Sequence, residues 1–148
     1  MSNVQDIADI QQLVARFANS FDCKDWDALA SCLSEQVFTD YSELRGSPPE
    51  TMTREKFIEL RKHALQNLRT HHLVGNFEIE LRKDQGEAKV SMMIYRRNVE
   101  SDIFNTHCFY RFGLERSANG WRINSIVQKV FWNEGQTIFT PEFRSGRA

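Results

Sequence analysis

The sequence predicts one α+β domain in which three helices precede an antiparallel sheet and cover one of its faces. The first half of the 148-residue chain carries apolar residues at helical spacing. The second half alternates apolar and polar residues in runs that short turns separate. The length is typical of a single domain, and an apolar content of 41% is sufficient for a sizeable core.

Helical periodicity indicates three segments in the first half of the chain. Residues 4–21 place an apolar side chain at every third or fourth position, as in an amphipathic helix. The polar residues 22–25 end that helix, and Asp25 is a suitable N-cap for a short second helix, so the two form a hairpin. Thr53 is a suitable N-cap for the third helix. The apolar stripe expected on that helix is Phe57, Leu60, Ala64 and Leu68.

Strand patterns account for most of the rest. A first strand is predicted over residues 36–42, before a turn-rich segment at residues 46–49. Turns at residues 84–86 and 119–120 separate later strands. These strands are expected over residues 73–81, 88–97, 106–116 and 121–132. The tail over residues 135–148 is expected to be loosely held.

The charge balance argues against nucleic acid and membranes as partners. Nineteen Lys and Arg residues oppose 20 Asp and Glu residues, for a formal charge of −1, so no broad positive field is present. The basic pairs Arg61-Lys62 and Arg96-Arg97 are short and lie among acidic residues. We therefore expect both pairs to lie on solvated faces.

The cysteines and the N-terminus favour a soluble cytoplasmic protein. Cys23, Cys32 and Cys108 are odd in number and lack a C-x-x-C spacing, which is typical of free thiols in a reducing compartment. Asp6 and Asp9 stand where a signal peptide would be apolar, and no apolar run is long enough to span a membrane.

Asp22 and His72 are the strongest candidates for chemistry. Each is expected at the end of an element, where helices laid on a strongly curved sheet leave an open mouth that suits a small-molecule pocket. An imidazole can take up and return a proton near neutral pH, while a carboxylate on its other nitrogen fixes the tautomer. The alternative roles are structural: a helix-end residue for Asp22 and a hydrogen-bonded strand histidine for His72.

Neither a metal nor a cofactor is predicted. His71 and His72 are adjacent on a strand, so they point to opposite faces and cannot act as paired ligands. Together with His107 and Cys108 they lack any recurring zinc-ligand spacing. The sequence also contains no phosphate-binding loop, dinucleotide fingerprint or nucleophile elbow.

Residues 18–29, with the sequence ANSFDCKDWDAL, resemble the helix-hairpin signature of scytalone dehydratase. Thr39-Asp40-Tyr41, residues 68–72 (LRTHH) and Asn119-Gly120-Trp121 are also similar and occur in the same order, so the resemblance covers nearly the whole chain. That family belongs to the nuclear-transport-factor-2-like superfamily, with the SnoaL-type cyclases, ketosteroid isomerase and hexachlorocyclohexane dehydrochlorinase. The resemblance implies a cone-shaped α+β barrel with a buried active site, and a sheet that forms homo-oligomer contacts, as a dimer or a trimer.

The resemblance also implies roles for three residues. In scytalone dehydratase an aspartate orients a histidine, a second histidine assists, and two tyrosines hold a water against the substrate carbonyl while water is lost through an enolate. The orienting aspartate matches Asp22, the first histidine matches His72 in the Thr-x-His motif, and the strand tyrosine matches Tyr41. These three are the predicted catalytic residues.

Two positions depart from the family pattern. Phe21 replaces the tyrosine that precedes the aspartate, so one hydroxyl for the polarising water is absent. The second histidine falls near Asn98, and His107 is the one nearby histidine that could replace it, so both assignments stay open. We expect Phe21, Trp26, Asn98 and His107 around the substrate.

The predicted function is a cofactor-independent lyase that removes a C–H proton from a small cyclic or polyketide-like substrate and expels water or another leaving group. An isomerase or cyclase would use the same base without a leaving group. A non-catalytic binding or assembly domain is the alternative from another class. It predicts that Asp22 and His72 lie out of hydrogen-bond range, or that side chains such as Phe38, Phe57 and Phe131 fill the cone.

Overall fold

A computed structural model describes residues 3–135, which begin with a helical hairpin. The hairpin consists of α1 (Asn3–Cys23) and α2 (Trp26–Cys32). The Asp25 carboxylate accepts a hydrogen bond of 3.1 Å from the backbone N–H of Ala28, which confirms the predicted N-cap. Lys24 takes a left-handed conformation, with φ of 51°, and so reverses the chain between the two helices.

The next segment contains two elements that the sequence pattern missed. Between β1 (Leu33–Asp40) and α4 (Arg54–Leu65) lie the single turn α3 (Ser42–Arg45) and the short strand β2 (Glu50–Thr53). β2 pairs antiparallel with β1. It has only four residues, of which Met52 alone is buried, so its alternation was too short to stand out against the prolines before it.

The remaining strands are longer than predicted. They are β3 (Leu68–Arg82), β4 (Gln85–Asn98), β5 (Phe104–Ser117) and β6 (Gly120–Gly135). Leu68 was expected on the buried stripe of the third helix but is the first residue of β3. His72 is therefore the fifth residue of its strand and does not open it.

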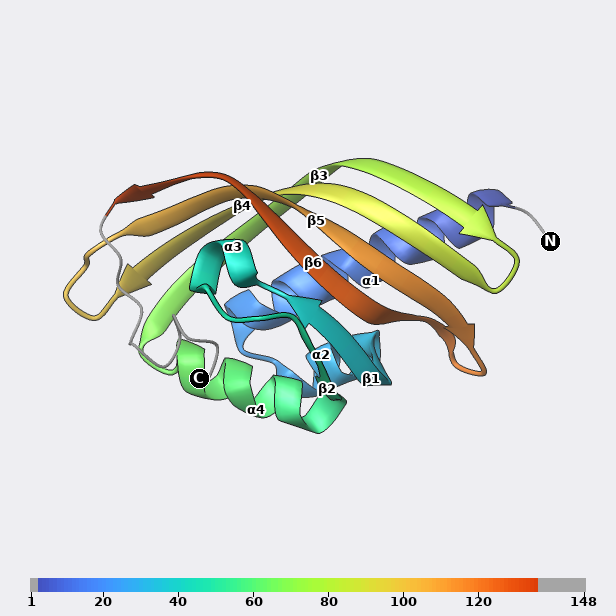
Figure 1. Ribbon diagram of the computed structural model, residues 1–148, viewed down its shortest axis with the longest axis horizontal. Helices are drawn as coiled ribbons and strands as arrows, with labels where there is room; N and C mark the ends of the chain where they lie inside the picture. The colour runs from blue at the N-terminus through green and yellow to red at the C-terminus, as the bar shows by residue number, and fades with distance from the viewer. Residues whose placement is uncertain (1–2, 136–148) are drawn as a thin grey trace.

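One six-stranded sheet has the order β2-β1-β6-β5-β4-β3. Neighbouring strands pair antiparallel except β1 and β6, which are parallel. The sheet curves strongly and the helices lie on its concave side, which gives the cone predicted from the resemblance (Figure 1). No helix in the described part of the chain is long and apolar enough to cross a membrane.

The core lies between the helices and the concave face of the sheet. Alternation along β4 and β5 turns every second side chain inward, where it meets the apolar stripe of α1. The Phe17 ring lies edge-on to those of Phe21 and Phe112, with centroids 5.0 and 5.2 Å apart. The tail prediction for residues 135–148 lies outside the described residues apart from Gly135.

Candidate active site

Asp22 and His72 are in direct contact. Asp22 lies in the last turn of α1 and His72 lies on β3, and the His72 Nδ1 atom is 2.6 Å from Asp22 Oδ1. The backbone N–H of His72 donates to Asp22 Oδ2 at 2.8 Å, and the Thr70 hydroxyl donates to Oδ1 at 2.9 Å. Three donors from one strand thus fix the position of the carboxylate at the end of the helix.

The contact defines which His72 nitrogen can act as a base. Because Nδ1–H donates to the carboxylate, we assign Nε2 as the unprotonated nitrogen of the neutral ring. Burial lowers the pKa of His72 below its usual value, while Asp22 acts in the opposite direction. The neutral ring therefore predominates near neutral pH. Phe21 stacks against it, with ring centroids 5.4 Å apart, and limits its rotation.

His72 faces a small cavity inside the cone, with a volume of about 40 Å³. Phe21 and Ile94 supply apolar parts of its wall. Its polar wall consists of Tyr41, Arg45, Arg61, Thr70, Arg96 and Tyr110. No aspartate or glutamate lies in this lining among the described residues. No three His, Cys, Asp or Glu side chains within residues 3–135 gather closely enough to hold a metal ion.

Tyr41 follows β1 and is buried, with 7% of its surface exposed. Burial raises the pKa of its hydroxyl to about 12, and the nearby Arg61 acts in the opposite direction. The hydroxyl therefore stays protonated near neutral pH and can donate a hydrogen bond to a ligand oxygen. Tyr110 stands edge-on to it, with ring centroids 6.2 Å apart.

Three of the residues predicted around the substrate lie away from this cavity. Trp26 packs edge-on against Phe21, with ring centroids 6.4 Å apart, but does not line the cavity. Asn98 is held in the β4–β5 turn, where its side chain accepts a backbone hydrogen bond of 2.9 Å from Asp102. His107 stacks on Trp132, with centroids 4.5 Å apart, on the outer face of the sheet. Strand alternation turns its neighbours inward and His107 outward.

The expectation that both basic pairs lie on solvated faces is wrong for one residue of each. Arg61 and Arg96 are 4% and 5% exposed and line the cavity, whereas Lys62 and Arg97 are exposed. The spacing of these residues indicates their burial, because Arg61 lies four residues after the buried Phe57 on α4. Arg96 likewise continues the inward series of β4, which runs through Ala88, Val90, Met92 and Ile94.

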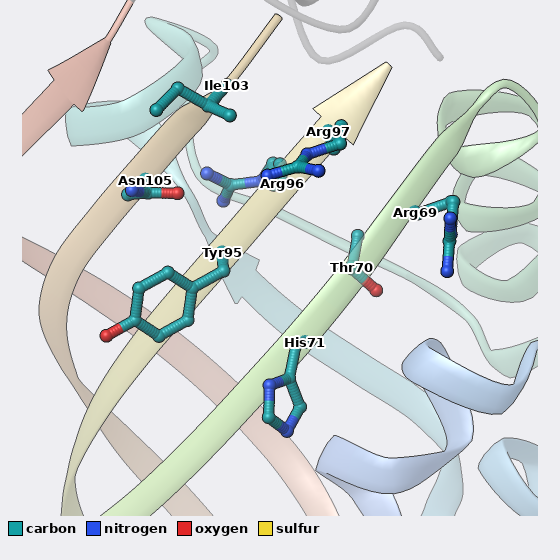
Figure 2. Close-up of a pocket in the computed structure, with 8 residues that line it drawn as sticks. All are labelled: Arg69, Thr70, His71, Tyr95, Arg96, Arg97, Ile103 and Asn105. Atoms are coloured by element: carbon teal, nitrogen blue, oxygen red, sulfur yellow. The ribbon is translucent and has the colours of Figure 1, made fainter. Parts of the chain in front are cut away.

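A larger hollow of about 310 Å³ lies at the same end of β3 and β4, where outer-face side chains such as His71 and Tyr95 line it together with Thr70 and Arg96, which also line the inner cavity. Figure 2 shows His71 and Tyr95 on these neighbouring strands, beside Asn105 on β5. The ring centroids of His71 and Tyr95 are 6.4 Å apart. The hollow lacks a carboxylate and does not include His72, so the inner cavity is the better candidate for acid-base chemistry.

A curved sheet with helices on its concave side and a part-buried Asp-His pair is the arrangement of a cone-shaped α+β protein of the nuclear-transport-factor-2-like class. Comparison with known sequences gives the family: the chain belongs to the SnoaL-like domain family, whose domain matches residues 2–127.

Its relatives include fungal proteins named for scytalone dehydratase. A scytalone dehydratase-like protein of Passalora fulva, claB, is 39% identical over 75 residues, which span 48% of this chain and 46% of that protein. Scytalone dehydratase PfmaJ of Pestalotiopsis fici is 27% identical and aligns with 96% of this chain and 80% of its own. Dehydratase GME11372 of Pestalotiopsis microspora is 34% identical over 87% of this chain and 89% of its own.

Solved structures share the fold at low identity. The Kfla4162 protein of Kribbella flavida superposes with a TM-score of 0.87 and is 20% identical, with 90% of this chain and 95% of that chain covered. The hexachlorocyclohexane dehydrochlorinase LinA-type3 of Novosphingobium barchaimii gives a TM-score of 0.78 at 15% identity, with 92% of this chain and 93% of that chain covered.

Proposed function

We propose that this protein is a cofactor-independent lyase of the dehydratase type, with His72 as the base and Asp22 as its orienting partner. The observation that carries this proposal is the 2.6 Å contact between His72 Nδ1 and the Asp22 carboxylate beside a cavity. The dehydratase names of the relatives and the dehydrochlorinase fold neighbour agree with an elimination reaction.

The proposed reaction begins when His72 Nε2 takes a proton from the substrate carbon next to a carbonyl. The electrons of the broken C–H bond form the enolate, whose oxygen accepts a hydrogen bond from the Tyr41 hydroxyl. The double bond then forms as the C–O bond at the β carbon breaks and its electron pair leaves with the oxygen. The imidazolium returns its proton to that oxygen, so water leaves and His72 is neutral again. Asp22 stabilises the transient imidazolium.

The substrate class follows from the relatives and from Phe21. Scytalone dehydratases act on scytalone by name, but Phe21 here offers no hydroxyl, which favours a different small cyclic or polyketide-like substrate. The cavity volume of about 40 Å³ is below the roughly 300 Å³ of common ligand pockets. A ring substrate therefore requires the cavity side chains to move apart on binding.

The function is tested by incubating the protein with a panel of cyclic β-hydroxy ketones, scytalone included, in deuterated water. We expect a product that has lost the mass of one water, detected by mass spectrometry. An isomerase or cyclase would release no water, and its product would be heavier than the substrate only by the deuterium taken up at the reacting carbon. No change in any substrate, with no deuterium uptake, would favour a non-catalytic binding domain.

The burial of His72 predicts the pH dependence. Because the pKa of the folded imidazole lies below 6.5, kcat/KM should rise with pH around a midpoint lower than 6.5 and level off above it. The unfolded chain takes up this proton at a higher pH than the folded chain does. Folding stability should therefore fall as the pH drops from 6.5 toward the folded pKa. An NMR titration of the His72 ring gives the midpoint directly, and a value at or above 6.5 would contradict the prediction.

The outer face of the sheet is proposed as a homo-oligomer interface. Leu73, Met93, His107 and Trp132 form a row in register across four strands. Leu73 and Trp132 are 47% and 55% exposed, although large apolar side chains are usually covered. Trp132→Glu should shift the protein to a monomer in size-exclusion chromatography with light scattering, whereas Val4→Glu on α1 should not. A monomeric parent protein would contradict the proposal.

A further inference from the structure

Three arginines from three different elements converge on the cavity that His72 faces. Arg45 ends α3, Arg61 lies on α4 and Arg96 lies on β4. They are 8%, 4% and 5% exposed, so all three are more than nine-tenths buried. The carboxylate of Asp22 already accepts hydrogen bonds from His72 and Thr70. The described wall of the cavity is therefore strongly cationic.

Arg61 is the residue whose surroundings remain incomplete. Its Nε and Nη1 atoms are buried and have no hydrogen-bond partner among the described residues. Its guanidinium lies 5.0 Å from the Tyr41 ring and 4.9 Å from the Phe57 ring. The faces of these rings attract the cation, but they do not accept hydrogen bonds from its in-plane N–H groups as an oxygen atom would. A buried guanidinium costs free energy unless hydrogen bonds compensate it, so acceptors are missing from this site.

The arginines are arranged to receive a ligand from inside the cavity. The Arg96 Nη1 atom donates to the Thr106 hydroxyl at 2.7 Å, which fixes this side chain in the wall. The Arg45 guanidinium lies 4.3 Å from the Tyr41 ring, which also contacts Arg61. Tyr41, the proposed polarising residue, thus has two cations close to its ring. A carboxylate accepts charged hydrogen bonds from a guanidinium, and a space of about 40 Å³ has room for a group larger than one water molecule.

We propose that Arg61, supported by Arg45 and Arg96, forms a subsite for a carboxylate group of the substrate. This inference rests on the proposed function and narrows its substrate class to cyclic or polyketide-like acids. The carboxylate would supply an acceptor to the Nη1 or the Nε atom of Arg61, each of which lacks one. Binding it would hold the rest of the substrate against His72 Nε2, so the charge serves orientation as well as affinity.

The test uses acetate and its neutral analogue acetamide, which are small enough for the cavity as it stands. Binding is followed in ¹⁵N-labelled full-length protein through the Arg61 Nε–H signal, which is assigned by its loss in Arg61→Lys. We expect acetate to bind at least roughly 10-fold more tightly than acetamide and to shift this signal, as charged hydrogen bonds provide. Arg61→Met should remove the preference, while Lys62→Met, its exposed neighbour, should keep it.

Equal binding of acetate and acetamide by the parent protein would overturn the subsite, and this comparison needs no variant to fold. Unchanged acetate affinity in a folded Arg61→Met protein would overturn it as well. His72→Gln separates the two proposals, since it removes the base but leaves the arginines. Suppose that His72→Gln still binds acetate and that the parent protein dehydrates none of the β-hydroxy ketones and acids. This pair of results would contradict the proposed lyase function but would support the anion subsite. Dehydration by a parent protein that binds acetate and acetamide equally would support the lyase function and overturn the anion subsite.

Discussion

Replacing His72 by alanine should lower kcat for dehydration roughly 100- to 10,000-fold, the range that one positioned general base contributes. His72 lines the same cavity as Tyr41, and its Nε2 atom is the nitrogen that we assign as unprotonated because Nδ1 contacts Asp22. Tyr110 and Tyr41 are protonated phenols because burial raises the pKa of each. The wall therefore holds no other base among the described residues. Steady-state kinetics with the substrate found in the panel measures the loss.

His71→Ala is the matched control for this variant. It removes the same ring one residue away, on the outer face of β3, and should keep kcat within about twofold of the parent. Asp22→Asn should also be severely impaired, because an amide can donate to Nδ1 and then leave the proton on Nε2. Full activity in both His72→Ala and Asp22→Asn would exclude the proposed mechanism.

Phe17→Ala should lower the free energy of unfolding by ~3–5 kcal/mol, which is a large share of the ~5–15 kcal/mol typical of a domain. Phe17 is 1% exposed and lies at the centre of the aromatic cluster between α1 and β5. Its removal leaves a cavity and deprives Phe21, which stacks on His72, of its edge contact. Urea denaturation followed by circular dichroism gives the change, and the thermal midpoint should fall by roughly 10 °C.

Phe17→Leu is the control because it keeps most of the buried apolar volume. It should cost distinctly less than the alanine variant. Equal losses for the two variants would show that the ring itself, and not the volume it fills, determines stability. A loss below ~1 kcal/mol for Phe17→Ala would contradict the placement of Phe17 at the centre of the core.

The sequence was sufficient for the parts of the fold that rest on local periodicity. The cap at Asp25 and the stripe of α1 follow from spacing alone, and the meander of β3 to β6 follows from alternation and turns. The pairing of β1 with β6 could not be predicted this way. These strands are separated by most of the chain, and no local pattern records which strands become neighbours.

The candidate site divides in the same manner. Asp22 and His72 are 50 positions apart in the sequence, so no local spacing predicts their contact. The motifs shared with the scytalone dehydratase family indicated it. The buried arginines were missed because a charged residue was assumed to be solvated. Arg61 instead keeps the four-residue step from Phe57 toward Leu65, so its periodicity was the better guide to its burial than its charge.

The position of β6 in the sheet has a consequence for how the chain folds during synthesis. β6 is the last described strand but lies between β1 and β5. On the ribosome, β1 therefore has no partner on the edge that later pairs with β6 until residues 120–135 have emerged. An exposed strand edge of this kind invites pairing with other chains. Chains interrupted before residue 120 should therefore aggregate, although they already contain Asp22, Tyr41 and His72.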